Sequence, residues 1–325
     1  MLKTAESRLR RIELGAPLAG EGPLWMSAEI FVPERIRPPA TVLFCVPGGG
    51  MTRAYFDLGG GEPAAGSFSF ARAMTAQGFI VVTLDYLGVG DSSRPADGFA
   101  ITADLLSRCN QLAVAQISQA LREGRLDPAL PACPDLVSIG VGHSMGAMLT
   151  ILQQAAYRPH AALVLLGFTT RGLPQYVTPG ERAALEKPDW RGHVAALAKA
   201  RFNGFAYVTL APRDDDGSAA AAALRRAQDS VLATPATHSM MPGNVSAEAA
   251  MMDVPLFLGL GERDMAGPPH ATPQNFPACY DLTLNVVPGA GHHPFVTPAA
   301  GRLFERMGGW LAQQAAASST VHGAP

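Results

Sequence analysis

Short apolar runs that lack the polar alternation of a half-buried strand recur along this chain, together with segments of helical pattern. The runs lie at residues 41–46, 79–84, 136–141 and 161–166. The helical patterns lie between and after them, at residues 67–77, 101–123 and 144–157. A strand covered on one face only would alternate apolar and polar residues, so these runs predict a sheet that is covered on both faces. The sequence therefore predicts an α/β fold with a mostly parallel central sheet flanked by helices.

The composition supports a large core and bears on the partners. Of the 325 residues, 48% are hydrophobic and 16% are charged, which excludes a disordered chain because such chains combine low apolar content with high net charge. The formal net charge of -2 indicates neither nucleic acid nor an acidic membrane surface as a partner. We expect binding to neither.

In the second half of the chain, the alternation of strand-like runs and helical patterns is interrupted and then resumes. Strand-like runs return at residues 254–260 and 282–287, and a final helix is expected from Thr297, followed by a frayed tail from Ala315. Between them the strand signals disappear, and helix signals such as the capping box from Thr178 to Glu181 remain. We therefore expect a core domain over residues 1–170 and 254–325, with residues 171–253 inserted as a helical cap.

Cysteine usage and the N-terminal sequence bear on the compartment. The four cysteines are scattered without metal or redox spacing, and the first eleven residues contain no apolar stretch of signal-peptide length. No run reaches the length of a membrane span. These features favour a cytoplasmic protein without a metal site or a cofactor.

A G-x-S-x-G motif lies directly after the strand-like run that ends at residue 141 and directly before a helical pattern. Its members are Gly142, Ser144 and Gly146. Small residues two positions before and after a serine allow a turn so tight that the hydroxyl projects from the end of a strand. This position predicts that Ser144 is a nucleophile.

A serine nucleophile requires a base, and the base requires an acid to orient it. Asp264 follows the strand-like run 254–260, and His292 follows the run 282–287. We expect His292 to be the base and Asp264 the acid, in the chain order serine, aspartate, histidine. Glu262 is an alternative acid, His293 is an alternative base, and His143 is expected to be a packing residue.

With these motifs in place, the chain resembles the α/β-hydrolase superfamily over nearly its whole length. The stretch from Asp85 to Ser92 is similar to the D-x-x-G-x-G-x-S stretch of that family. The resemblance implies a serine esterase or thioesterase-like enzyme in which Ser144 attacks, His292 is the base and Asp264 orients it. It also implies that the insertion at residues 171–253 lies over the active site.

An oxyanion formed by attack of Ser144 needs backbone N–H donors. One expected donor is Met145, directly after the nucleophile. The second should come from the loop after the first buried strand, where the family has a histidine and this chain has Pro47 followed by three glycines. The donor is Gly49 or Gly50, and we choose Gly49.

The expected reaction is acyl transfer to water. The resemblance excludes the related epoxide hydrolases and haloalkane dehalogenases, because these use an aspartate where this chain has Ser144. We expect a carboxylic ester or lactone of a small to medium hydrophobic compound as substrate. The alternatives are a type II acyl-thioesterase, a carbon–carbon bond hydrolase and a receptor-like binding protein, and the sequence allows a homodimer.

Two groups of side chains bear on the substrate. Arg53, Arg94 and Arg171 could meet a substrate carboxylate, but we expect solvated surface roles for them. Apolar residues in the 171–253 segment are expected to provide the substrate-facing surface. They are Leu173, Tyr176, Trp190, Phe202, Phe205, Tyr207, Met240, Met241, Met251 and Met252.

Overall fold

The structure, a computed structural model, describes residues 6–59, 68–209 and 218–322, and an eight-stranded sheet runs through its centre. The strand order is β1-β2-β4-β3-β5-β6-β9-β10. The strands are β1 (Glu6–Gly15), β2 (Leu24–Val32), β3 (Thr41–Val46), β4 (Ile80–Asp85), β5 (Val137–His143), β6 (Ala162–Leu166), β9 (Leu256–Gly261) and β10 (Leu282–Val287). All strands from β4 to β10 in this order are parallel, whereas β1 and β2 form an antiparallel hairpin and β2 pairs antiparallel with β4. The predicted α/β fold with a mostly parallel sheet is confirmed.

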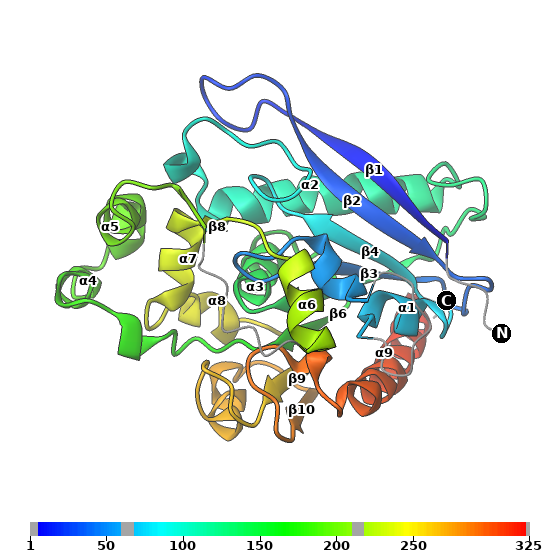
Figure 1. The fold of residues 1–325 in the computed structure, drawn as a ribbon. Coiled ribbons are helices and arrows are strands. Elements are labelled where there is room, and N and C mark those ends of the chain that lie inside the picture. Colours follow the sequence, from blue (N-terminus) through cyan, green and yellow to red (C-terminus); the bar gives the residue numbers. More distant parts are fainter. Residues whose placement is uncertain (1–5, 60–67, 210–217, 323–325) are drawn as a thin grey trace.

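Helices cover both faces of the sheet, which explains why the central strands are apolar on both sides (Figure 1). Helices α2 (Ala103–Arg122) and α3 (Met145–Tyr157) contribute to the hydrophobic core on one face. Helices α1 (Phe70–Thr75) and α9 (Ala300–His322) contribute to the core on the other face. Every residue of β3, β4 and β5 is buried.

The segment 171–253 is built from short elements, most of them helical. They are α4 (Pro179–Leu185), α5 (Val194–Arg201), β7 (Tyr207–Val208), α6 (Ala219–Arg226), β8 (Val231–Leu232), α7 (Ala233–Met240) and α8 (Ser246–Ala250). The capping box is present, since Thr178 and Glu181 exchange hydrogen bonds at the start of α4. The expectation of helix signals only was wrong at one place, because β7 and β8 form a small antiparallel ribbon. Helix α6 ends at Arg226, and residues 227–230 separate it from β8, which begins at Val231.

The last helix differs from its prediction at both ends. Residues 294–296 form a 3₁₀ turn, Thr297 is extended, and α9 begins only at Ala300. The expected frayed tail from residue 315 is instead helical as far as His322. Tertiary contacts hold it, because Ala315 is buried and the Gln314 amide donates to Asp281 Oδ2 at 2.9 Å.

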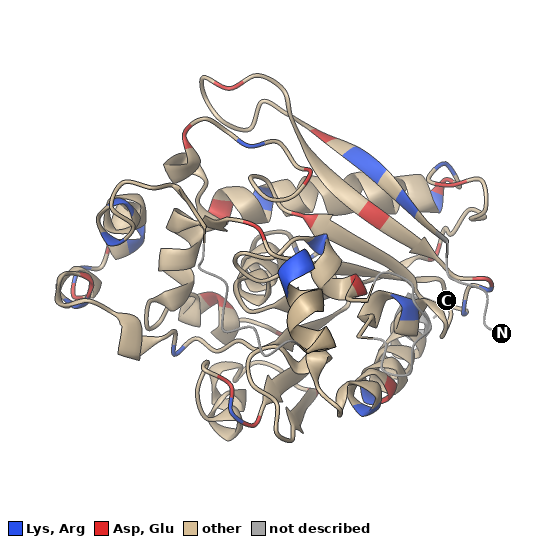
Figure 2. Cartoon of the chain, in the orientation of Figure 1, with Lys and Arg blue, Asp and Glu red and all other residues tan. Residues whose placement is uncertain are grey.

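Charged residues are sparse along the ribbon, and both signs are interspersed (Figure 2). Helices of the described part of the chain are too short or too polar to span a membrane.

Candidate active site

The predicted site residues come from different strands but meet at one edge of the sheet. Ser144 directly follows β5, Asp264 follows β9, and His292 follows β10. The glycine turn follows β3, which lies beside β5. Because these strands are parallel, the segments after them share the carboxyl edge, where open α/β sheets bind their ligands.

The backbone at Ser144 adopts an unusual conformation that projects its hydroxyl. Its φ of 53° and ψ of -122° lie outside the common regions for a residue with a side chain. The turn is possible because the residues two positions before and after Ser144 are glycines. A Cβ on Gly146 would lie 2.1 Å from the carbonyl oxygen of Val46, and one on Gly142 would lie 2.5 Å from the Cα of Ala147.

Ser144, His292 and Asp264 form a continuous chain of hydrogen bonds. His292 Nε2 lies 2.8 Å from Ser144 Oγ, and His292 Nδ1 lies 2.8 Å from Asp264 Oδ1. A carboxylate can only accept, so Nδ1 carries the proton and Nε2 is left to accept from the serine hydroxyl. This is the tautomer that a general base needs.

Asp264 is set up to remain ionised although it is buried. Burial raises the pKa of its carboxyl, but the hydrogen bond and charge of His292 and the Ala266 N–H outweigh this effect, so the pKa lies below its usual value. The Ala266 N–H donates to Asp264 Oδ1 at 2.9 Å. A fixed negative charge therefore faces the imidazole.

His143 has a second contact besides the packing that was expected of it. Its ring stacks on Tyr55 with 4.5 Å between centroids. Burial lowers the pKa of His143 to about 3, so the ring is neutral at pH 7. Its Nε2 lies 2.8 Å from the carbonyl oxygen of His292, to which a neutral ring can donate. The sequence held no signal for this bond, which joins residues far apart in the chain.

The alternative residues lie elsewhere or have other contacts. Glu262 is exposed and its carboxylate accepts from the Gly289 N–H at 2.8 Å. His293 lines the cavity beside His292, with 5.4 Å between the two ring centroids. The expectation of a solvated Arg53 was wrong, because its side chain is only 14% exposed and pairs with buried Asp85.

The two expected oxyanion donors lie close to each other, since a Cβ on Gly49 would be 3.9 Å from the Cβ of Met145. Gly48, Gly49, Gly50 and Met145 line the same cavity as Ser144. The Gly50 N–H faces the phenol of Tyr86, whereas the N–H groups of Gly49 and Met145 donate to no group within the described residues. This arrangement favours Gly49 over Gly50 as the second donor.

A cavity of about 990 Å³ opens in front of Ser144 and His292. Four of the apolar residues expected to face substrate line it, namely Leu173, Tyr176, Phe202 and Met240. Others do not, because Met241 is buried in the packing, Met251 is exposed and Trp190 lies edge-on against His238. Phe168, Met265 and Leu224 add further apolar surface. Among the described residues no three His, Cys, Asp or Glu side chains are grouped so as to hold a metal ion.

Comparison with known proteins gives one family and many similar folds. The family model described as "Alpha/beta hydrolase family" matches residues 42–301. No curated protein matches the chain.

Three of the solved structures with a similar fold illustrate the range of named activities. A thermophilic esterase from Thermogutta terrifontis has a TM-score of 0.60 and 15% identity over 94% of this chain and 99% of that one. A proline iminopeptidase from Mycobacterium smegmatis has a TM-score of 0.61 and 18% identity over 96% and 100%. A monoacylglycerol lipase from Paleococcus ferrophilus has a TM-score of 0.58 and 17% identity over 90% and 99%.

Proposed function

The chain belongs to the alpha/beta hydrolase family, and we propose that it is a serine hydrolase that cleaves carboxylic esters or lactones of small to medium hydrophobic compounds. The observation that carries the proposal is the chain of 2.8 Å hydrogen bonds from Ser144 through His292 to Asp264, which faces a large cavity with apolar walls.

The first half of the reaction forms an acyl-enzyme. Ser144 Oγ attacks the substrate carbonyl carbon while His292 Nε2 takes the hydroxyl proton. Asp264 stabilises the imidazolium that results. The negative oxygen of the tetrahedral intermediate lies between the N–H groups of Gly49 and Met145, and loss of one such donor costs about 10² to 10³ in rate in comparable enzymes.

The second half releases the acid. His292 gives its proton to the leaving alcohol oxygen, the carbon–oxygen bond breaks, and the alcohol departs. Water then takes the place of the alcohol, His292 again accepts a proton, and attack on the acyl carbon regenerates Ser144. No metal or cofactor takes part in these steps.

The apolar cavity lining supports a hydrophobic substrate. Leu173, Tyr176 and Phe202 present no charge to a ligand, and Arg201 in the same wall is already paired with Glu181. Arg225 also lines the cavity. Burying a substrate carboxylate against Leu173, Tyr176 and Phe202 would leave the charge without a partner, which costs free energy. An uncharged acyl group avoids this cost.

Ser144→Ala tests the proposal with a panel of aryl esters, lactones, acyl-thioesters and anilides. We expect the wild type to hydrolyse short aryl esters and the variant to lose about 10⁴-fold or more of kcat/KM. A fluorophosphonate should label the wild type but not Ser144→Ala. Ser239→Ala is the labelling control, because the Ser239 hydroxyl is already bonded to the Ala236 carbonyl and its loss should leave the label in place.

The same panel separates the alternatives. Acyl-thioesters cleaved far faster than oxygen esters would indicate a thioesterase, and turnover of dienoate-type diketones would indicate a carbon–carbon hydrolase. Tight ligand binding without labelling of Ser144 would indicate a receptor-like protein. Wild-type turnover in Ser144→Ala would contradict the mechanism.

A further inference from the structure

The turn that carries the proposed oxyanion donor, residues 48–52, is held by contacts outside the triad. Gly48, Gly49 and Gly50 have no side chains, so this backbone has unusual conformational freedom. Buried Tyr86 restricts the conformation of this turn. Its hydroxyl donates to the Gly48 carbonyl at 3.1 Å and faces the Gly50 N–H.

A second restraint comes from residues 227–230, which we name the strap. The strap lies in the 171–253 segment and runs antiparallel to the turn, with Gln228 opposite Met51. The Thr52 N–H donates to the Ala227 carbonyl at 2.8 Å, and the Asp229 N–H donates to the Gly50 carbonyl at 2.9 Å. Backbone bonds on both sides of Met51 therefore fix the turn.

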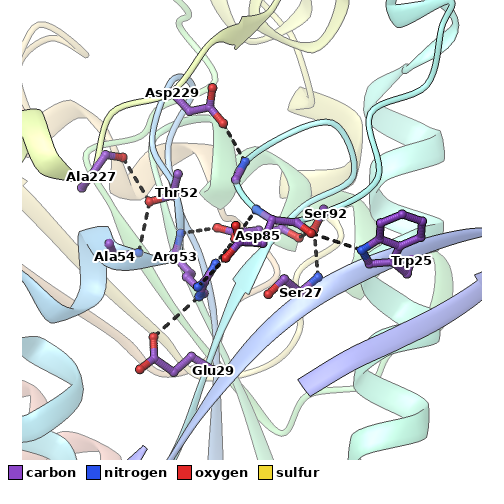
Figure 3. Close-up of polar contacts among 12 residues, drawn as sticks. Trp25, Ser27, Glu29, Thr52, Arg53, Ala54, Asp85, Ser92, Ala227 and Asp229 are labelled. Atoms are coloured by element: carbon purple, nitrogen blue, oxygen red, sulfur yellow. Dashed lines mark hydrogen bonds and ion pairs between the residues drawn. The ribbon is translucent and has the colours of Figure 1, made fainter. Parts of the chain in front are cut away.

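The strap is itself fixed by the carboxylate of Asp229. One oxygen accepts from the Gly90 N–H at 2.6 Å, and the other accepts from the Ser230 N–H at 2.5 Å. The guanidinium of Arg94 lies 3.1 Å from the same carboxylate. Figure 3 shows Asp229 reaching from the strap to the loop after β4. This side chain thus joins the strap to residues 86–94.

The loop that receives Asp229 is a firm support because it is tied to buried Asp85. Asp85 accepts from the N–H of Arg53 at 2.6 Å (Figure 3). It also accepts from the N–H of Asp91 at 3.1 Å. The Ser92 hydroxyl donates to the Asp85 carbonyl at 2.6 Å. Gly90 passes so close that a Cβ there would lie 2.3 Å from Asp85 Oδ2. Residues at the end of β4 therefore hold both ends of the turn, because Asp85 binds the Arg53 N–H and Tyr86 binds the Gly48 carbonyl.

We propose that Asp229 is a positioning residue for the oxyanion hole, which acts by holding the strap and, through the strap, the Gly50 carbonyl. The Gly50 carbonyl belongs to the peptide group between Gly50 and Met51, and the Gly49 N–H lies two peptide groups earlier in the same short turn. Because Tyr86 also holds the Gly48 carbonyl, a fixed Gly50 carbonyl limits the orientations of the Gly49 N–H between these two points. The inference rests on the proposed serine hydrolase function. It adds a coupling between the 171–253 segment and the transition state.

Asp229→Ala is the test, with hydrolysis of one short aryl ester as the readout. Because a donor misplaced by about 1 Å costs on the order of 10²-fold, we expect kcat to fall about 10- to 100-fold. KM should change less than about threefold, since ground-state contacts remain. The pH midpoint of kcat/KM should not move, because His292 and Asp264 are untouched. Hydrogen exchange of the peptide that contains residues 48–52 should be faster than in the wild type.

Matched variants distinguish positioning from general damage. Asp229→Asn keeps an oxygen that can accept from the Gly90 N–H, and it should restore kcat to within about threefold of the wild type. Asp229→Ser is a second truncation for the case in which the alanine protein does not fold. Asp253→Ala removes another carboxylate, one that pairs with exposed Arg158 at the opposite edge of the sheet, and should leave kcat and exchange at the turn unchanged.

The outcomes separate the two proposals. A wild type without Ser144-dependent turnover overturns both. A wild type with such turnover, together with Asp229→Ala or Asp229→Ser that matches it in kcat and in exchange at residues 48–52, overturns the role of Asp229 alone. A fall in kcat that Asp229→Asn fails to restore also overturns it, as does a loss confined to KM.

Discussion

The two walls of the cavity are built in different ways. The wall that carries Ser144 and His292 is formed by loops at the ends of parallel strands, of which β5 is fully buried and β10, the last strand of the sheet, is partly buried. The second wall comes from residues within 173–209 and 218–240, whose α-helices have seven or eight residues each. The sheet thus positions the proposed catalytic groups, whereas the short helices line the space that we propose for the substrate.

Ion pairs compensate for the short helices of the second wall. Helices of this length are not stable alone in water. The Glu181 carboxylate accepts from the Thr178 N–H at 2.8 Å and from Arg201 Nε at 2.7 Å, which ties α4 to α5. Burial raises the pKa of Glu181, but these bonds outweigh it and the pKa lies below its usual value. Arg191 and Glu248 make a similar pair between residues 190–193 and α8.

The largest expected effect distinguishes a loss of kcat/KM for every ester from a change in the preference for acyl-chain length. His292→Ala and Asp264→Asn on the first wall should each lower kcat/KM by about 10³- to 10⁴-fold for every ester, because the general base or its tautomer is lost. Leu173→Ala on the second wall should leave acetate ester turnover near the wild type and change the ratio of octanoate to acetate kcat/KM by about tenfold. A series of p-nitrophenyl esters of increasing acyl length measures both.

Combination with Ser144→Ala provides the control for this prediction. Residues that act as a unit show non-additive losses, so each double variant should be no worse than its worst single variant. A double variant far below both singles would show that His292 or Asp264 acts apart from Ser144. A uniform loss over all acyl lengths in Leu173→Ala would abolish the distinction between the walls.

A smaller effect is expected on stability when the same chemical change is made in each region. In Gly146→Ala the new Cβ would meet backbone oxygens of Val46 and Pro47 at 2.1 and 2.5 Å, which cannot move without displacing β3. We expect a loss of about 3 kcal/mol or more in the free energy of unfolding. Gly180→Ala in α4 meets no atom within 4 Å and should stabilise by up to about 1 kcal/mol. Urea titration at pH 7 measures both, and similar losses at the two sites would contradict the comparison.

The sequence predicted the first wall better than the second for a physical reason. Buried parallel strands show in the sequence as continuous apolar runs. The predicted runs 41–46 and 282–287 have the same bounds as β3 and β10, and the others agree to within about two residues. The glycine motif locates Ser144 at the end of β5. Asp264 and His292 follow β9 and β10, so all three residues are expected at the same edge of the sheet. Their proximity follows from local patterns and from the rule that parallel strands share an edge.

Contacts between distant segments were beyond such reasoning. The bond from Gly90 to Asp229 joins residues 139 positions apart, and the bond from His143 to the His292 carbonyl spans 149 positions. Arg53 follows a glycine loop and was expected at the surface, yet its guanidinium pairs with buried Asp85. The ribbon of β7 and β8 has two residues in each strand, too few for a periodic signal.

The smallest expected effect is on the pH dependence of stability. It is compared at two buried histidines, one in the core and one in the 171–253 segment. Burial lowers the pKa of core His160 to about 3, and it also lowers the pKa of His238 in α7, where the hydrogen bond to the Asn244 carbonyl opposes the shift. Below about pH 6.5 the unfolded chain binds a proton that the folded His160 does not, so stability falls as the pH decreases from 6.5 toward 3.

His160→Gln retains a side chain that can bond to the Ser138 hydroxyl, which lies 2.8 Å from His160 Nδ1, but it cannot titrate. We expect the slope of unfolding free energy against pH between 4 and 6 to decrease by up to about 1.4 kcal/mol per pH unit, which corresponds to one proton. His238→Gln should decrease the slope over a narrower window just below pH 6.5, since its shift is opposed. Urea midpoints at half-unit pH steps give both slopes. An unchanged slope in His160→Gln would mean that this histidine is protonated in the folded protein, and that the core at this position admits a charge.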